Sequence, residues 1–143
     1  MQRGNIMRIE ENTLTAEDFY QLYTSAGWGN PSLEQIEVAL ENSLITFTAI
    51  VDDRVVGMAR LLGDCAMSYY LKDFVLFPEY QRQGIGKAMI AHIENYIRNR
   101  SKDGWFATLE FMSVKGKEEF YKKLGFEERP TVNRGPGMHK RYE

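Results

Sequence analysis

The interpretation of this chain turns on one segment, FVLFPEYQRQGIGK at residues 74–87. It begins with an apolar run that favours a β-strand, and Pro78 ends that strand. A helix follows the glycines, because Ile85, Met89 and Ile93 are spaced by four. The first N–H groups of a helix lack helical acceptors and lie at the positive end of its dipole. The segment therefore predicts a phosphate or pyrophosphate site.

Two common phosphate-binding loops do not match this segment. The nucleoside-triphosphate loop needs Gly five residues before its Gly-Lys pair and Ser or Thr after it, but Gln81 and Ala88 stand there. The dinucleotide loop, Gly-x-Gly-x-x-Gly, fails at Met89. A nucleotide-binding enzyme is therefore disfavoured. A plain strand-to-helix turn stays the alternative to an anion site.

The surrounding sequence predicts an α/β chain without repeats or linkers. Thr15 and Ser32 are suited to cap two helices in the first third. The segments expected to form strands are 44–51 and 55–62, joined as a hairpin, then 68–77, 105–111 and one or two edge strands in the tail, 127–143. A short helix over 117–124 is expected to end at Gly125. This order predicts a mixed sheet with helices on both faces.

Composition narrows the classes of function. The length of 143 residues suits a single domain over 1–143. The net charge of −2 disfavours a nucleic-acid binder, and one Cys with two His are too few for a usual structural zinc site, so no metal is expected. No apolar run approaches a membrane span, and no apolar signal core opens the chain, so a cytoplasmic protein is expected. The natural start, Met1 or Met7, is left open.

The glycine loop and its context resemble the acetyl-CoA motif of the GNAT superfamily of N-acyltransferases. That motif has Gln or Arg, two residues, Gly, one residue, then Gly or Ala, which Gln81, Gly84 and Gly86 match. A second segment, FYKKLGF at 120–126, matches the superfamily pattern Phe-Tyr-x-x-x-Gly-Phe. The resemblance covers roughly residues 44–126. It implies a GNAT-like, mostly antiparallel central sheet that is splayed at the cofactor site, and acetyl-CoA as the cofactor.

The resemblance also implies where CoA binds. Its pyrophosphate would lie on the amides of the loop, beside the positive charges of Arg82 and Lys87, and its pantetheine would pair with the edge of the preceding strand. A main-chain N–H near Val75 would polarise the thioester carbonyl. The implied cofactor-binding residues are Phe74, Val75, Leu76, Arg82, Gln83, Gly84, Ile85, Gly86, Lys87 and Ala88.

Tyr121 matches the superfamily tyrosine that protonates the departing CoA thiolate. Helical geometry turns Tyr121 about 100° away from Phe120, so its hydroxyl can reach a cleft. The alternative is an amphipathic Tyr on the flank of a core helix. Many superfamily members have Asn seven residues before this Tyr and Ala four before it, but here Val114 and Lys117 occupy those positions. The CoA contact of that Asn is not carried over.

The acceptor amine must lose a proton to attack, so a base is sought among the carboxylates. Asp73 is the first candidate, because strand alternation places it with Leu71 and Val75 on one face, where it would be desolvated. Glu110 is the second and also a candidate for substrate binding. For both, a structural or solvated carboxylate is the weightier alternative. Trp28, between the two leading helices, either lines the acceptor site or packs in the core.

The leading hypothesis is an acetyl-CoA-dependent N-acetyltransferase. A primary amine, in a small molecule or a peptide, would attack acetyl-CoA directly in a ternary complex. The alternative is a catalytically silent, CoA-binding regulatory module. A homodimer is plausible from the superfamily. The acceptor, the acyl preference and the oligomeric state are not readable from the sequence.

Overall fold

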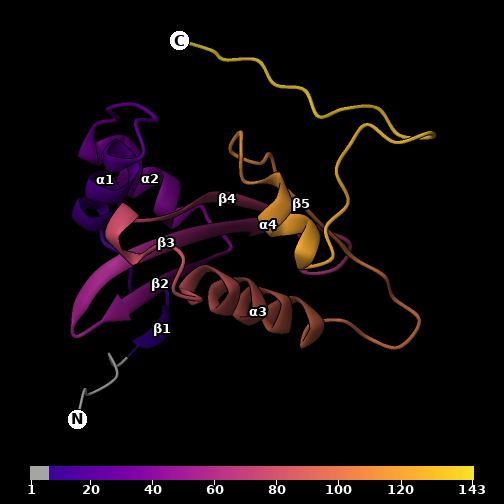
Figure 1. Cartoon of the computed structure of the whole chain (residues 1–143), viewed down its shortest axis with the longest axis horizontal. Helices are drawn as coiled ribbons and strands as arrows, with labels where there is room; N and C mark the ends of the chain where they lie inside the picture. Colours follow the sequence, from indigo (N-terminus) through magenta and orange to yellow (C-terminus); the bar gives the residue numbers. More distant parts are fainter. Residues whose placement is uncertain (1–6) are drawn as a thin grey trace. The chain divides into compact units, whose positions relative to one another are not determined.

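A five-stranded sheet with the strand order β1–β2–β3–β4–β5 forms the framework (Figure 1). Strands β1 to β4 pair antiparallel with their neighbours, and β5 joins β4 in parallel. This confirms the expected mixed, mostly antiparallel sheet. The strands are β1 (Met7–Glu11), β2 (Ile45–Val51), β3 (Arg54–Gly63), β4 (Ser68–Leu76) and β5 (Thr108–Glu110).

The computed structural model describes residues 7–143. The chain divides into two compact units, Met1–Glu110 and Phe111–Glu143. The sheet belongs to the first unit, and helix α4 (Glu118–Lys123) belongs to the second. The question of a start at Met1 or Met7 bears on residues 1–6, which lie outside the described residues. A single domain over 1–143 stays a prediction.

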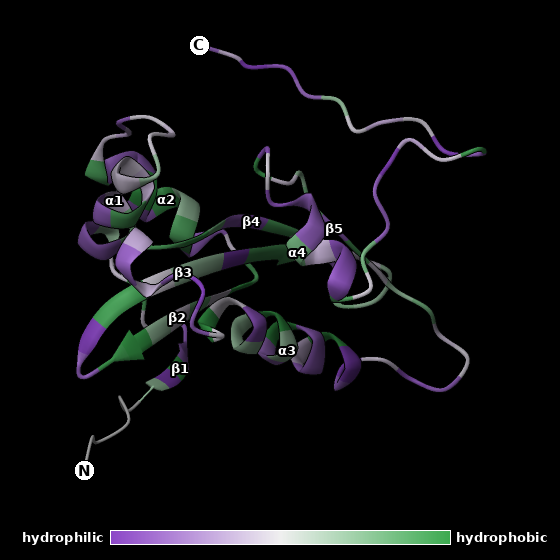
Figure 2. Cartoon of the chain, in the orientation of Figure 1, coloured by the Kyte–Doolittle hydropathy of each residue, from purple (hydrophilic) through white to green (hydrophobic). Residues whose placement is uncertain are grey.

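Helices cover both faces of the sheet in the first unit, as expected. Helices α1 (Ala16–Ser25) and α2 (Leu33–Glu41) share a buried cluster with Met58 of β3. Helix α3 (Ile85–Arg98) contacts Phe47 of β2 through the Tyr96 ring, with centroids 5.9 Å apart. Thr48 is the register partner of Met58, so Phe47 points to the opposite face. Figure 2 shows β2 and β3 largely hydrophobic between these helices.

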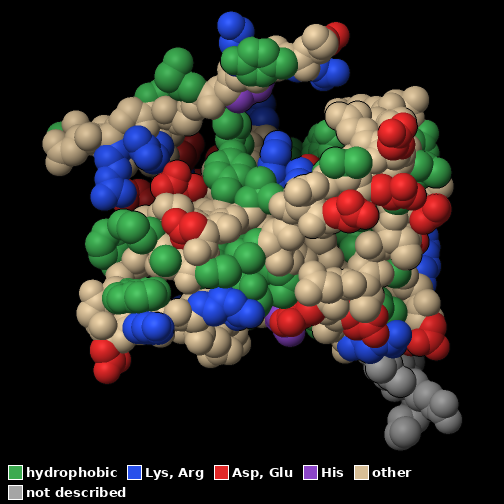
Figure 3. Space-filling view, turned by 180° about the vertical axis from the view of Figure 1, so that it is seen from behind, with side chains coloured by type: hydrophobic (Ala, Val, Ile, Leu, Met, Phe, Trp, Pro, Cys, Tyr) green, Lys and Arg blue, Asp and Glu red, His purple; other side chains and the backbone are tan. Residues whose placement is uncertain are grey.

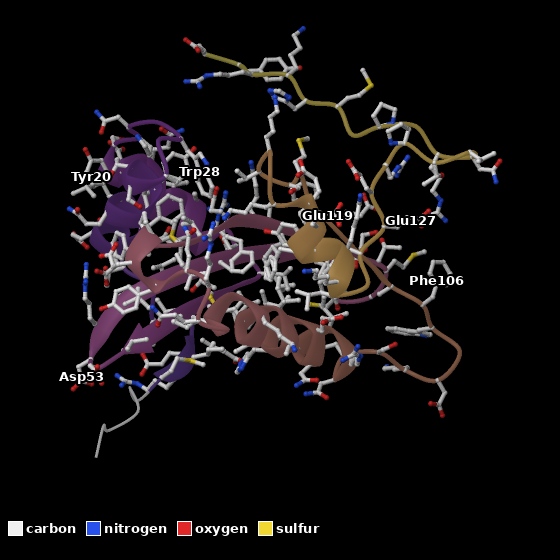
Figure 4. The ribbon with its side chains drawn as sticks, in the orientation of Figure 1. Tyr20, Trp28, Asp53, Phe106, Glu119 and Glu127 are labelled. Carbon is white, nitrogen blue, oxygen red and sulfur yellow. The ribbon has the colours of Figure 1, made fainter. Side chains whose placement is uncertain are left out.

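Local sequence signals account for the ends of several elements. The hydroxyl oxygens of Thr15 and Ser32 accept the N–H groups of the third residue onward, both at 3.1 Å, as the capping patterns predicted. The β2–β3 hairpin turns through Asp52 and Asp53, whose φ values are 49° and 63°. Two consecutive positive φ values suit a two-residue hairpin turn. Asp53 marks the tip of this hairpin in Figure 4.

Other expectations about the strands were wrong. Strand β1 was not foreseen, because its charged sequence, MRIEE, carries little apolar alternation. Strand β5 is shorter than expected, and Trp105 and Phe106 lie before it, 47% and 70% exposed. No strand forms within the described tail, 127–143. Its prolines lack a ladder donor, and its glycines weaken a strand, which explains why no edge strand forms there.

None of the helices formed by residues 7–143 combines the length and apolarity needed to cross a membrane.

Candidate active site

Strand β4 is paired on both edges in its first part and on one edge only in its second part. Strand β5 pairs with β4 from Ser68 to Tyr70, and the ladder stops there. Strand β3 continues to pair with β4 as far as Leu76. All three residues of β5 pair with β4, and among the described residues no strand pairs with that edge of β4 beyond Tyr70. An unpaired strand edge can bind an extended, peptide-like ligand.

A β-bulge interrupts β4 in the middle of this region. The register between β3 and β4 shifts there, so that Asp73 and Phe74 together oppose Ala59. Asp73 has a φ of 54°, in the left-handed region. A bulge inserts one extra residue into a strand. Each side chain after it therefore points to the face opposite to the one that simple alternation would assign.

The bulge reverses the faces to which side chains point. Leu71, before the bulge, pairs with Leu61, whereas Val75, after it, pairs with Met58. Leu61 and Met58 are three positions apart on β3 and therefore point to opposite faces of the sheet. Their partners on β4, Leu71 and Val75, lie on opposite faces for the same reason. Val75 packs in the cluster beneath α1. The expectation that Asp73 shares one face with Leu71 and Val75 was wrong for this reason.

The bulge also changes which backbone amides of β4 point away from β3. The Phe77 N–H donates to the Val56 carbonyl at 2.9 Å. Backbone groups alternate sides along an antiparallel strand, so those of Leu76 point away from β3, to the edge of β4 that lies beyond the end of β5. The Leu76 carbonyl indeed accepts a bond from Gln81 Nε2 at 3.1 Å. The amide expected near Val75 is therefore better matched by that of Leu76.

A tight turn leads from β4 into α3. The 3₁₀ helix η1 (Pro78–Tyr80) follows β4, and Gln83 Nε2 donates to the Glu79 carbonyl at 3.0 Å. Gly84 is the N-cap of α3 and has a φ of 86°. An added Cβ at Gly84 would meet no heavy atom within 4 Å, so the backbone conformation, not crowding, calls for glycine.

The first turn of α3 presents main-chain donors. The Ala88 N–H makes a helical bond to the Gly84 carbonyl at 3.1 Å. The Ala88 amide, expected among the pyrophosphate donors, is therefore engaged within the helix. The preceding amides have no helical acceptor, and the helix dipole favours an anion beside them. We name this group the cradle; it consists of Gly84, Ile85, Gly86 and Lys87, with the exposed Arg82 before it.

The carboxylate of Asp73 is held by a guanidinium. Arg60 Nε donates to Asp73 Oδ2 at 2.9 Å, and the two side chains are only 15% and 8% exposed. Buried charges persist in proteins when they are paired. The geometry therefore favours the structural interpretation of Asp73 over the role of general base.

Tyr121 lies on α4 in the second unit, where an aromatic cluster surrounds it. Its ring centroid lies 4.4 Å from that of Phe111 and 6.0 Å from that of Phe126. Burial raises the pKa of Tyr121 to about 12. The phenol is consequently protonated at neutral pH and acts as a hydrogen-bond donor.

The end of α4 has the form that its sequence predicted. Gly125 has a φ of 96° and donates to the Lys122 carbonyl at 3.0 Å. The Phe126 N–H donates to the Tyr121 carbonyl at 3.2 Å. These two bonds form a Schellman motif, which fixes the turn of backbone that carries Tyr121.

The two residues proposed for the acceptor lie apart on the first unit. Trp28 packs edge-on against Tyr23, with ring centroids 5.5 Å apart. Glu110 is exposed at the end of β5, opposite Tyr70. A concavity of about 560 Å³ opens between α1 and the start of α2, and Trp28 is not in its lining. Figure 4 labels Trp28 and also Tyr20, which does line the concavity. The concavity is lined by Glu17, Tyr20, Gln21, Asn30, Pro31, Ser32 and Leu33.

Sequence reasoning overlooked Arg60, although a signal was present. Arg60 stands among apolar residues in the buried middle of the strand RVVGMARLLG, whose other arginine, Arg54, is exposed at the strand's start. A cation in a buried strand requires a counter-charge. That requirement points to a carboxylate on a neighbouring strand, which Asp73 supplies. Among residues 7–143, no group of three His, Cys, Asp or Glu side chains is placed to hold a metal ion.

Comparison with known proteins decides the family. The model of the GNAT acetyltransferase domain matches residues 42–128, more than half of the chain. The chain belongs to the GNAT acetyltransferase family. This confirms the family, the fold and the enzyme class, an acetyl-CoA-dependent acyltransferase, that the two motifs predicted.

Individual relatives agree with this assignment. The uncharacterized N-acetyltransferase ycf52 of Gracilaria tenuistipitata var. liui is 27% identical over 131 residues, covering 87% of this chain and 70% of that protein. The chain covers 66% of the homologue from Pyropia yezoensis. A probable acetyltransferase from methicillin-resistant Staphylococcus aureus, of unknown function, superposes with a TM-score of 0.82 at 29% identity, covering 96% of this chain and 100% of its own.

A more distant structure shows the same fold. Aminoglycoside N-acetyltransferase AAC(6')-Iy, solved in complex with CoA, has a TM-score of 0.72 at 19% identity and covers 99% of both chains.

Proposed function

We propose that this GNAT domain transfers an acetyl group from acetyl-CoA to a primary amine, by direct attack within a ternary complex. The observation that supports this most is the junction of β4 and α3. There, the outward-facing Leu76 amide follows the bulge, and the cradle lies a short turn further on. The proposed chemistry draws on backbone donors and one phenol.

The cradle and the edge of β4 fit the two ends of CoA. The amides of Ile85, Gly86 and Lys87 would donate to the pyrophosphate, with Arg82 and Lys87 adding charge. The edge at 74–76 would pair with pantetheine. Acetyl-CoA, when bound, supplies the activated acetyl thioester. The Leu76 N–H would then donate to the thioester oxygen and stabilise the negative charge that develops as the amine attacks.

Tyr121 is proposed as the donor to the leaving sulfur. Its pKa of about 12 lies above the ~8.5 of a free thiol, so complete proton transfer to the thiolate is uphill. The phenol therefore contributes chiefly a hydrogen bond that strengthens as charge builds on sulfur. A thiolate leaves reasonably well unaided, so this contribution is helpful and not indispensable.

The contacts of Asp73 and Glu110 bear on which group takes the proton from the acceptor amine. A lysine-like ammonium has a pKa of ~10.4 and must lose its proton before attack. Asp73 is bound to Arg60, so we propose that the proton leaves to solvent water. Glu110, exposed at the end of β5, is assigned to binding the cationic amine.

The charge on the leading helices supports a cationic acceptor. Helix α1 carries two acidic residues and α2 carries three, and neither helix contains Lys or Arg. Acidic side chains are prominent on this side of the molecule (Figure 3). A local field of one sign raises the concentration of the opposite charge. On the charge of these helices we propose a cationic amine as the acceptor, with Trp28 beside it.

The test is release of CoA thiol from acetyl-CoA with a panel of amines, together with calorimetry of CoA binding. Polyamines, aminoglycosides, amino acids and peptides with free N-termini form the panel, and uncharged alcohols are the control. Thiol release that requires an amine supports the proposal. Saturable CoA binding without release for any amine would instead favour the silent regulatory module. A cytoplasmic location and a homodimer stay predictions.

A further inference from the structure

Asp73 adopts a backbone conformation that its surroundings must hold. Its φ of 54° is in the left-handed region, which side chains other than glycine adopt at a cost. Asp and Asn tolerate this conformation better than most residues, but they do not prefer it over an extended strand. The bulge at Asp73 and Phe74 thus needs a stabilising interaction that offsets the conformational cost of the left-handed φ.

The contact with Arg60 supplies this interaction across the strands. Arg60 is the register partner of Lys72, the residue before the bulge. Two cations directly opposite on a sheet repel each other. The left-handed turn at Asp73 brings its carboxylate to Arg60 Nε at 2.9 Å, with both side chains largely buried. The bulge therefore places a counter-charge where the sheet would otherwise bury an unbalanced cation.

The ion pair consequently selects which amide faces the open edge of β4. Before the bulge, the Leu61 carbonyl accepts a bond from the N–H of Leu44, the residue just before β2, so its partner Leu71 directs its backbone groups away from β3. Simple alternation from Leu71 would give the same outward direction to Val75. The extra residue moves that direction to Leu76.

We propose that Arg60 is a positioning residue for acetyl transfer. Its guanidinium holds Asp73, and with it the bulge that turns the Leu76 amide toward the thioester. This inference rests on the proposed function in assigning the Leu76 amide to the thioester oxygen. Arg60 itself touches no reacting atom, and Asp73 acts through backbone geometry and not as a base.

The first experiment compares Arg60→Met and Arg60→Lys with Arg98→Met. Arg98 forms an exposed pair with Glu94 at 3.6 Å and serves as the matched control. Arg60→Met is expected to lower kcat on the order of 100-fold, the usual effect of a misplaced catalytic group. Arg60→Lys should recover part of this loss, and Arg98→Met should match the wild type. The pH profile of kcat/KM should keep its shape in all three. An unchanged kcat in Arg60→Met overturns the proposal.

The second experiment separates positioning from base catalysis at Asp73. Glycine adopts a φ of 54° freely but has no carboxylate, so the double variant Arg60→Met, Asp73→Gly retains the bulge without a buried charge. The kcat of this double variant should be at least about tenfold higher than that of the second double variant, which combines Arg60→Met with Asp73→Ala. Equal loss in the two double variants, with the acidic limb of the pH profile removed, identifies Asp73 as a base and overturns the proposal.

A third measurement needs no turnover. CoA and acetyl-CoA are titrated separately into ¹⁵N-labelled protein, and the Leu76 amide resonance is followed. A shift specific to acetyl-CoA in the wild type, lost in Arg60→Met, supports the role of Arg60 even where no amine is acetylated. The same shift retained in Arg60→Met refutes that role even where acetyl transfer is confirmed. Urea unfolding of each variant shows that the comparison is made on folded protein.

Discussion

Tyr121 makes a quantitative prediction about alkaline stability. Burial raises its pKa from the ordinary 10.0 to about 12 in the folded chain. Where the folded pKa exceeds the unfolded one, the stabilisation is complete below the unfolded value and is lost as pH rises through the folded value. The two-unit shift corresponds to about 2.7 kcal/mol over the whole range. Half of this, about 1.4 kcal/mol, is lost by pH 11.

The assay is urea unfolding of the wild type and Tyr121→Phe at several pH values between 8 and 11. Lysines and other tyrosines titrate in both proteins, so the difference between the two free energies of unfolding isolates Tyr121. That difference should fall by about 1.4 kcal/mol, with the wild type losing stability relative to the variant. A difference that stays constant from pH 8 to pH 11 would refute the burial of this phenol.

Four further outcomes follow from the geometry. Tyr121→Phe should lower kcat about 10- to 100-fold, with the calorimetric Kd for CoA unchanged. Gly84→Ala should cost about 1–2 kcal/mol in urea unfolding and weaken CoA binding, because alanine resists a φ of 86°. Arg82→Gln should raise the Kd for CoA and flatten its dependence on salt, since an exposed charge is screened. Ser32→Ala should cost about 1 kcal/mol in urea unfolding without altering CoA affinity, since it removes only a helix cap.

The parts of the fold that could be predicted from the sequence are those set by nearby residues. The caps at Thr15 and Ser32 act over three residues, and the glycine end of α4 acts over five, so their signals are contiguous. The β2–β3 hairpin is equally local. The cradle was also predictable, because a strand, two glycines and an amphipathic helix follow one another directly. Short-range patterns of this kind need no knowledge of register.

The features that escaped prediction depend on pairing between distant residues. Nothing in YLKDFVL indicates a left-handed Asp73, because the reason for it lies on β3, at Arg60. A prediction from strict alternation, without the bulge, therefore places each side chain and amide of β4 after Asp73 on the wrong side of the strand. Strand β1 likewise exists through its partner β2, from Glu11 opposite Phe47 to Met7 opposite Val51, residues far apart in the sequence.

The case of Asp73 shows why burial alone is a poor indicator of a catalytic base. Desolvation was the reason to consider this carboxylate, and it is indeed buried, 8% exposed. The same desolvation makes an unpaired carboxylate costly, so the fold supplies Arg60, which donates to Oδ2 of Asp73. A base that works on a cationic amine must keep an oxygen accessible to it. In this GNAT domain that condition disfavours Asp73, in keeping with the proposed loss of the proton to solvent water and with Glu110 as a group that binds the amine.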